Sequence, residues 1–330
     1  MQHVRLGRTG LNVSRICLGT MTFGLQVDED GSRAILDHAH DLGITFLDTA
    51  DAYPLGGDLT TAGRTEEILG RWLQGRRQNF VVATKCFAPV GPNPWDAGNS
   101  RRHIMDAVDA SLRRLQTDFI DLYQLHFDDR NVPLEESLQA LDDLVRVGKV
   151  RYVGCSNFLA YRLAQALGKS ETLRLARFDS VQPRYNLLFR EFERELFPLC
   201  LDEGVGVIPY NPIAGGLLSG KHDRAKPPEE GTRFTLGNAG AMYQDRYWHD
   251  NVFDTVDQLA KVAEEAGIPL PTLAVAWTLQ HPAITAPIVG ASRPEQLDAT
   301  CAAVETALDP DLVATLNEIT APYRRGDAPR

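Results

Sequence analysis

The chain has 330 residues, of which 43% are hydrophobic and 24% are charged, and this ordinary globular composition excludes a disordered or fibrous protein. It carries 34 basic and 44 acidic residues, a formal charge of −10, without any run of more than two basic residues. Binding to phosphate backbones needs a concentrated basic face, so nucleic acid is not expected as a partner. No stretch approaches 18 apolar residues, so no contact with a membrane is expected either.

Short apolar runs alternate with longer amphipathic stretches from one end of the chain to the other. Residues 3–14 come first and predict a small hairpin. Eight strands are then predicted, ending at Leu18, Leu47, Lys85, His126, Ser156, Gln182, Tyr210 and Val289. Helical spacing between and after them predicts helices at 29–42, 64–73, 101–115, 134–147, 159–167, 190–203, 252–266 with 272–279, and 294–306.

This alternation predicts the fold class. Strands that alternate with helices must run parallel with helical crossovers, and eight such units close into a barrel. A doubly wound sheet is the alternative, but it needs a glycine-rich turn after the first strand, and RICLGTMTFG does not have that spacing. We therefore expect residues 1–330 to form a single-domain (β/α)8 TIM barrel. The hairpin would close its floor, and the long connections 86–100 and 211–250 would form substrate-side loops.

Four polar side chains follow the ends of neighbouring predicted strands, where barrel enzymes place their active sites. Asp48 ends FLD, Tyr53 follows it, Lys85 ends VVATK and His126 ends DLYQLH. Asp48 would hold the buried Lys85 ammonium, and this ammonium would lower the pKa of Tyr53 and make it a general acid. His126 would orient a carbonyl oxygen beside it. Since no side chain supplies hydride, such a site requires a cofactor.

The motifs LDTADAY, VVATK, LYQLH, VGCSNF, VQPRYN and VIPYNPIAGGLLSGK occur in this order. Together they resemble the aldo-keto reductase superfamily, whose members reduce carbonyls with NADPH on a (β/α)8 barrel. The resemblance covers nearly the whole chain. It implies a catalytic tetrad of Asp48, Tyr53, Lys85 and His126, with Tyr53 as the proton donor.

The resemblance also implies cofactor contacts from three segments. The nicotinamide would be held by Ser156, Asn157 and Gln182 and stacked by Tyr210. The loop over the pyrophosphate would comprise Asn211, Pro212, Gly215, Leu217 and Lys221. The adenosine end would meet Gly290, Ser292, Arg293 and Gln296, and the guanidinium of Arg293 would favour NADP(H) by pairing with the 2′-phosphate. Ala299 and Thr300 depart from the family pattern, in which an acidic residue and an asparagine contact the adenine.

Within the superfamily, YNPIAGGLLSGK and MYQDRYW are most similar to the aflatoxin aldehyde and succinic semialdehyde reductases. Phe23 and Trp95 are interpreted as walls of the substrate pocket, and Arg233 as a group that grips a substrate carboxylate or a cofactor phosphate. No metal site is predicted, since His38 and His40 point about 200° apart on a helix.

Three questions stay open. The substrate is expected to be a small carbonyl compound, alternatively a nucleotide-linked ketosugar or another specialised metabolite, and the chain is a monomer or a homo-oligomer. The protein could instead be a cofactor-binding regulator, because some superfamily members serve as channel β subunits. The scattered cysteines and the absence of a signal-like start predict a cytoplasmic location.

Overall fold

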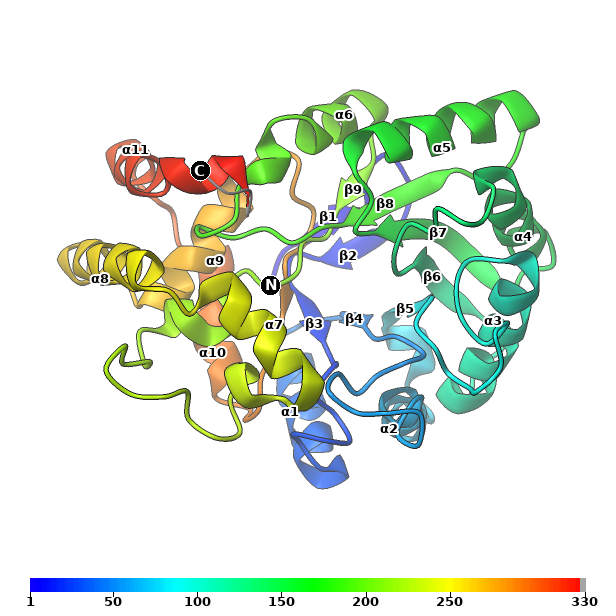
Figure 1. Ribbon diagram of the computed structural model, residues 1–330, viewed down its shortest axis with the longest axis horizontal. Helices are drawn as coiled ribbons and strands as arrows, with labels where there is room; N and C mark the ends of the chain where they lie inside the picture. Colours follow the sequence, from blue (N-terminus) through cyan, green and yellow to red (C-terminus); the bar gives the residue numbers. More distant parts are fainter. Residues whose placement is uncertain (327–330) are drawn as a thin grey trace.

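The computed structural model describes residues 1–326, and it contains an eight-stranded parallel sheet closed into a barrel (Figure 1). The strand order is β10-β3-β4-β5-β6-β7-β8-β9. Between β9 and β10 the circle is closed by hydrogen bonds from Thr285 N to Val207 O, at 2.8 Å, and from Ile288 N to Pro209 O, also at 2.8 Å. The strands are β3 (Cys17–Gly19), β4 (Phe46–Asp48), β5 (Val81–Cys86), β6 (Ile120–Leu125), β7 (Val150–Ser156), β8 (Phe178–Gln182), β9 (Gly206–Val207) and β10 (Ile288–Val289). The predicted (β/α)8 TIM barrel is therefore confirmed.

Helices cover the outside of the barrel, and in Figure 1 α3, α4 and α5 lie along strands β5 to β8. Two of them begin at side-chain caps: Asp28 accepts a hydrogen bond from Gly31 N, and Ser100 accepts one from His103 N. The helices in line with the strand-helix pattern are α1 (Glu29–Asp41), α2 (Arg64–Leu73), α3 (Arg101–Leu115), α4 (Leu134–Arg146), α5 (Ala160–Leu173), α6 (Leu196–Glu203), α8 (Asp250–Glu265), α9 (Leu270–Gln280) and α10 (Gln296–Cys301).

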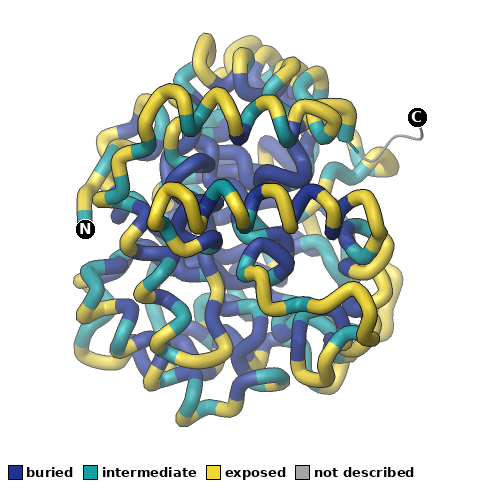
Figure 2. Tube along the Cα trace, turned by 90° about the vertical axis from the view of Figure 1, so that its left-hand side faces the viewer, coloured by how far each residue is buried: buried dark blue, intermediate teal, exposed yellow. Residues whose placement is uncertain are grey.

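Two apolar cores follow from the alternation of side chains along the strands. The larger core lies between the sheet and the helices, and in Figure 2 the buried segments of the chain, in dark blue, gather in the interior of the molecule. The smaller core fills the barrel, where Phe46, Ala83 and Leu122 meet two hairpin residues, Leu6 and Val13. The hairpin pairs β1 (His3–Arg5) with β2 (Asn12–Ser14) in antiparallel register, as expected for residues 3–14.

The structure differs from the predicted elements at several ends, since α6 begins at Leu196 and β9 ends at Val207, and it adds elements that were not predicted. The connection 211–250 contains the helix α7 (Gly237–Tyr247) and short 3-10 turns at Ala214–Ser219 and Arg233–Thr235. The sequence pattern does not predict α7, because two glycines and scattered apolar residues weaken the helical spacing. A further helix, α11 (Pro310–Ile319), occupies what the pattern left as a tail, and α5 continues to Leu173, beyond the predicted end at residue 167.

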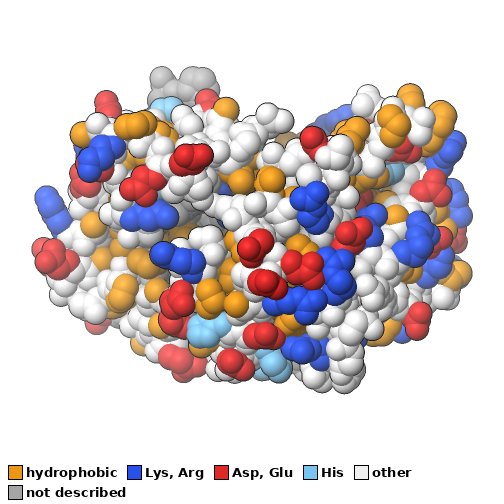
Figure 3. Space-filling view, turned by 90° about the horizontal axis from the view of Figure 1, so that it is seen from below, with side chains coloured by type: hydrophobic (Ala, Val, Ile, Leu, Met, Phe, Trp, Pro, Cys, Tyr) orange, Lys and Arg blue, Asp and Glu red, His pale blue; other side chains and the backbone are white. Residues whose placement is uncertain are grey.

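The surface carries charges of both signs, interspersed on the face shown in Figure 3. Among the described residues, no helix has the length and apolar character needed to cross a membrane.

One close helix contact yields a test of the packing. A Cβ atom placed on Gly70 in α2 would lie 2.1 Å from the carbonyl oxygen of Arg114 in α3, whereas one on Gly168 in α5 would meet nothing within 4 Å. We expect Gly70→Ala to lower the free energy of unfolding by about 1–3 kcal/mol through overpacking. Gly168→Ala should raise it by about 0.5–1 kcal/mol, because alanine favours a helix. Denaturant titration of both variants measures this, and equal effects would contradict the packing described.

Candidate active site

The candidate site is built around a buried ion pair at the carboxyl ends of neighbouring strands. Asp48 is the last residue of β4, and Lys85 is the next-to-last residue of β5. Lys85 Nζ lies 2.6 Å from Asp48 Oδ2 and donates a second hydrogen bond, of 2.7 Å, to the carbonyl oxygen of Thr49. The Lys85 side chain is 0% exposed and that of Asp48 is 4% exposed. Both charges are thus removed from water and depend on each other.

Two aromatic rings lie beside this pair. The Tyr53 ring centroid is 5.1 Å from Lys85 Nζ and 5.8 Å from the centroid of the His126 ring, which meets it edge-on. His126 directly follows β6, and its backbone N–H donates to the carbonyl oxygen of Cys86 at 2.9 Å. The structure therefore brings together the four residues singled out at the strand ends.

Burial and the Lys85 charge decide the protonation of these groups. Burial acts to lower the pKa of Lys85, but the negative charges of Asp48 and of an ionised Tyr53 raise it overall, so the ammonium persists. The pKa of His126 lies well below its ordinary value, first because of burial and then because of Lys85, so the imidazole is neutral. The pKa of Tyr53 is raised, because burial outweighs the opposing charge of Lys85. The expected lowering of this pKa is wrong for the free protein.

Asp48 also accepts two amide hydrogen bonds, and one of the donors was not singled out from the sequence. Gln182 Nε2 donates to Asp48 Oδ1 at 2.8 Å, and Gln124 Nε2 donates to the same atom at 3.2 Å. Gln124 had a usable signal: it lies two residues before His126 and two residues after the barrel-core residue Leu122, so strand alternation points it into the barrel.

The other residues expected around a nicotinamide form one connected network. Ser156 Oγ donates to the carbonyl oxygen of Gln182 at 2.8 Å, and Asn157 Nδ2 donates to the carbonyl oxygen of His126 at 3.0 Å. The Tyr210 hydroxyl donates to Asn157 Oδ1 at 2.9 Å. Asn157 has a φ of 58°, in the left-handed region that asparagine adopts more readily than most residues. This network lies on the strand ends next to the ion pair.

The loop after β9 is tightly wound. Asn211 and Ala214 have φ values of 61° and 50°, and Gly215 has one of 69°. A Cβ atom on Gly215 would lie 2.8 Å from the ring of Tyr243, so this position requires glycine. Of the other predicted loop residues, Pro212 and Leu217 are buried and Lys221 is exposed.

Arg233 lies between two segments that were expected to hold the cofactor. Its Cγ would be 3.4 Å from a Cβ on Gly215, and its Nη2 would be 4.0 Å from one on Gly290. Its Nη1 and the Nδ2 of Asn211 are buried, and neither has a hydrogen-bond partner among the described residues. Arg233 thus lies beside both the Gly215 loop and the Gly290 segment.

The segment after β10 is organised by Gln296, whose Oε1 accepts hydrogen bonds from Ser292 N at 2.8 Å and Ser292 Oγ at 3.2 Å. Arg293 is exposed beside it. At the two positions that depart from the family pattern, the Thr300 hydroxyl donates to Leu297 O within the helix, and Ala299 presents only a methyl group.

The predicted pocket walls lie in different surroundings. Phe23 is 0% exposed and packs in the core between sheet and helices, so its position lends no support to a role in the pocket. Trp95 is 44% exposed, and the guanidinium of Arg102 lies 4.4 Å from its ring centroid. Trp95 therefore lies on the surface, in the connection that follows β5.

Comparison with known proteins agrees with this geometry. The chain is 41% identical to the uncharacterized oxidoreductase YrpG of Bacillus subtilis over 327 residues, which cover 97% of the chain and 96% of that relative. A probable voltage-gated potassium channel subunit beta of Arabidopsis thaliana is 36% identical, with 92% of each chain covered. The versiconal hemiacetal acetate reductase of Aspergillus parasiticus is 34% identical, with 98% of each covered.

The model of the aldo/keto reductase family matches residues 15–321. This match spans every strand of the barrel and all the site residues described above. The chain therefore belongs to the aldo/keto reductase family.

Proposed function

We propose that this protein reduces an aldehyde or ketone to an alcohol with NADPH, and that Tyr53 supplies the proton. The observation that carries the proposal is the convergence of a neutral phenol and a neutral imidazole on a buried Lys85–Asp48 pair at the strand ends. Barrel enzymes place their chemistry at this end. The shared core, which runs from Ile16 to Leu316, supports treating residues 1–330 as one domain.

The residues present fit a dinucleotide. The orphaned, buried nitrogen atoms of Asn211 and Arg233 point to a missing acceptor, which a pyrophosphate would provide. Two exposed residues, Lys221 in the loop after β9 and Arg293 in the segment after β10, add positive charge near the proposed dinucleotide site. The proposed contacts are those expected from the family: Ser156, Asn157, Gln182 and Tyr210 for the nicotinamide, Asn211, Pro212, Gly215, Leu217 and Lys221 for the pyrophosphate, and Gly290, Ser292, Arg293 and Gln296 for the adenosine end. NADPH, when bound, supplies the hydride.

The side chains divide the remaining work. The Tyr53 phenol, kept protonated by burial, donates its proton to the carbonyl oxygen as negative charge develops there. The neutral ring of His126 offers an N–H to the same oxygen and orients it. Lys85 stabilises the phenolate that remains, and Asp48 holds Lys85 in place. The pKa of Tyr53 is therefore high before the reaction. The Lys85 ammonium stabilises the site most after Tyr53 has given up its proton, when a phenolate lies beside it.

We propose the substrate only as a class, an aldehyde or ketone. If Trp95, which is exposed in the connection after β5, forms a wall of the pocket as expected, substrates with an apolar body are favoured. The narrower expectation, a specificity like that of the aflatoxin aldehyde and succinic semialdehyde reductases, stays a prediction, since the relatives described above carry other names.

A panel of aldehydes, ketones and dicarbonyls with NADPH and NADH tests the proposed reaction, and no carbonyl-dependent loss of absorbance from either cofactor would overturn it. We expect Tyr53→Phe to lower kcat about 10²- to 10⁴-fold, because only the proton donor is lost. Cofactor affinity, measured by fluorescence titration, should stay within about twofold of wild type, well under 1 kcal/mol. Near-normal turnover in this variant would exclude Tyr53 as the acid.

The neutral His126 has a consequence for stability. At pH values above about 6.5 the ring is uncharged in both the folded and the unfolded chain. Below this pH the unfolded chain takes up a proton that the folded protein does not, so the free energy of unfolding falls by up to about 1.4 kcal/mol per pH unit. His126→Gln removes this contribution. Denaturant titrations from pH 7.5 to 5 should show a shallower loss of stability in the variant, and parallel curves would contradict a neutral, buried ring.

Arg293 tests the cofactor preference. If its guanidinium pairs with the 2′-phosphate, Arg293→Ala should weaken NADPH binding roughly tenfold to a hundredfold. NADH binding should change little, because NADH lacks that phosphate. Arg113→Ala, which removes another exposed arginine, on α3, is the matched control. If Arg293→Ala weakened the binding of NADPH and NADH equally, Arg293 would not pair with the 2′-phosphate.

A regulatory role is the second candidate, favoured by the similarity to the probable channel subunit beta of Arabidopsis thaliana. In that case the protein would bind the dinucleotide, turn over negligibly and form a stable complex with a membrane partner. Measured turnover on any carbonyl at an ordinary enzymatic rate would favour the reductase.

A further inference from the structure

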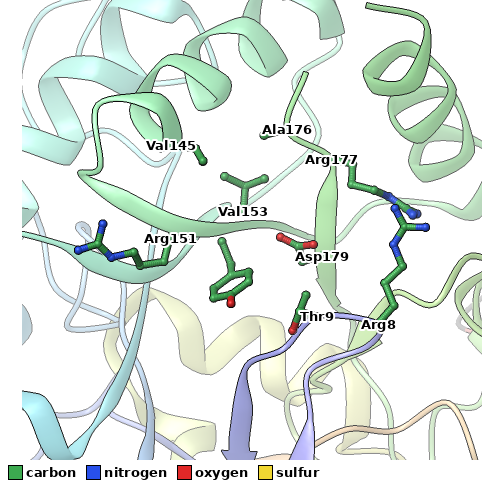
Figure 4. Close-up of a pocket in the computed structure, with 9 residues that line it drawn as sticks. Arg8, Thr9, Val145, Arg151, Val153, Ala176, Arg177 and Asp179 are labelled. Atoms are coloured by element: carbon green, nitrogen blue, oxygen red, sulfur yellow. The ribbon is translucent and has the colours of Figure 1, made fainter. Parts of the chain in front are cut away.

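A surface hollow lies at the opposite end of the barrel from the candidate active site. It has a volume of about 350 Å³ and lies beside the hairpin turn, close to the first residues of β7 and β8 (Figure 4). The residues that line it include Arg8, Val153, Ala176, Arg177 and Asp179. Asp179 is the second residue of β8, whose last residue, Gln182, reaches the Asp48 carboxylate. One strand thus connects two separate polar sites.

Two arginines converge at one side of this hollow. In Figure 4 the side chains of Arg8 and Arg177 point toward each other, although they come from different segments, the hairpin turn and the start of β8. Burial lowers the pKa of Arg177, and the charge of Arg8 lowers it further, which is the mark of two like charges in close range. Arg177 is paired with Glu203, at 3.1 Å, whereas the Arg8 side chain has no ion pair or hydrogen bond among the described residues.

The position of Arg8 is fixed without the help of its guanidinium. Its backbone N–H donates to the carbonyl oxygen of Gly204 at 2.8 Å. A Cβ on Gly204 would lie 3.0 Å from the Arg8 Cβ and 3.3 Å from its Cδ, so the aliphatic stem packs against that glycine. A Cβ on Gly7 would come within 2.4 Å of the same carbonyl oxygen. These backbone contacts already hold the hairpin turn against Gly204. The Arg8 guanidinium is therefore not needed to hold the hairpin in place.

The third polar group beside the hollow, the Asp179 carboxylate, lies at a β-bulge. Val153 pairs with Phe178 and Gly154 pairs with Ser180, so Asp179 is the extra residue between two ladder positions. Bulges of this kind redirect a side chain. Burial raises the pKa of the Asp179 carboxyl to about 6, although a backbone hydrogen bond from Val153 and the charges of Arg177 and Arg8 act to lower it. At neutral pH Asp179 therefore still carries most of its negative charge, within electrostatic range of both arginines.

We propose that this hollow binds a small organic oxyanion, a carboxylate or phosphate monoester with a short apolar body. The oxyanion head would lie between Arg8 and Arg177, because Glu203 pairs with Arg177 and leaves the Arg8 guanidinium available, and the head would compete with Asp179 for both arginines. The apolar body would lie against Val153 and Ala176, which line the same hollow. The volume is at the lower end of the range for small-molecule pockets, which sets the ligand size.

Isothermal titration of the full chain with phenyl phosphate and with benzoate tests this site, and benzyl alcohol is the uncharged control. We expect saturable one-to-one binding of at least one of the two anions and none of the alcohol. Which anion binds more tightly distinguishes a phosphate ligand from a carboxylate. Arg8→Gln and Arg177→Gln should each weaken binding roughly tenfold or more. Asp179→Asn should strengthen it, because the variant removes a competing negative charge.

Arg5→Gln is the matched control, since Arg5 lies in the same hairpin, is exposed and carries the same charge. It should leave binding unchanged. Lys221→Gln detects binding at the proposed dinucleotide site instead. The proposal fails if neither anion binds saturably, if Arg5→Gln weakens binding as much as Arg8→Gln, or if only Lys221→Gln weakens it. Because Arg8 is exposed and its guanidinium has no ion pair or hydrogen bond among the described residues, Arg8→Gln should fold normally.

Discussion

The Lys85–Asp48 pair is the constraint around which the strand ends are arranged. Removing two charges from water costs several kcal/mol per ion, and their attraction offsets this only if the remaining donors and acceptors are also satisfied. Here the carbonyl oxygen of Thr49 accepts from Lys85, and the amides of Gln124 and Gln182 donate to Asp48. These groups come from β4 and its following loop, β6 and β8, so one ion pair sets requirements on several strands at once.

The parallel barrel meets these requirements because it gathers strand ends. Each strand places alternate side chains inward, and the shared direction of the strands puts their last inward residues at one level. The hydrophobic residues that fill the barrel below, such as Phe46, Ala83 and Leu122, keep water from the pair. The low dielectric that results strengthens the pair and also keeps Tyr53 and His126 neutral. Packing and protonation in this site therefore have the same origin.

Much of this could be predicted from the sequence, because it depends on local pattern. Apolar runs and helical spacing indicated the eight strands and most helices, and polar residues at strand ends indicated Asp48, Lys85 and His126. The helix α7 could not be predicted, since its helicity depends on tertiary contacts such as those of Tyr243 and Tyr247, which are almost fully buried. The core position of Phe23 and the role of Gln124 likewise depend on neighbours distant in the sequence.

The direction of the Tyr53 pKa shift shows why pairwise reasoning from sequence falls short. A neighbouring lysine suggests a lowered pKa, but the net shift also depends on burial, which no spacing of residues reveals. The same applies to buried donors without partners. Asn211 Nδ2 and Arg233 Nη1 are orphaned in the part of the chain that the structure describes, and each such atom costs about 1–3 kcal/mol. A ligand that supplied acceptors there would recover this free energy, which is the physical reason for placing the pyrophosphate of the proposed cofactor beside these two residues.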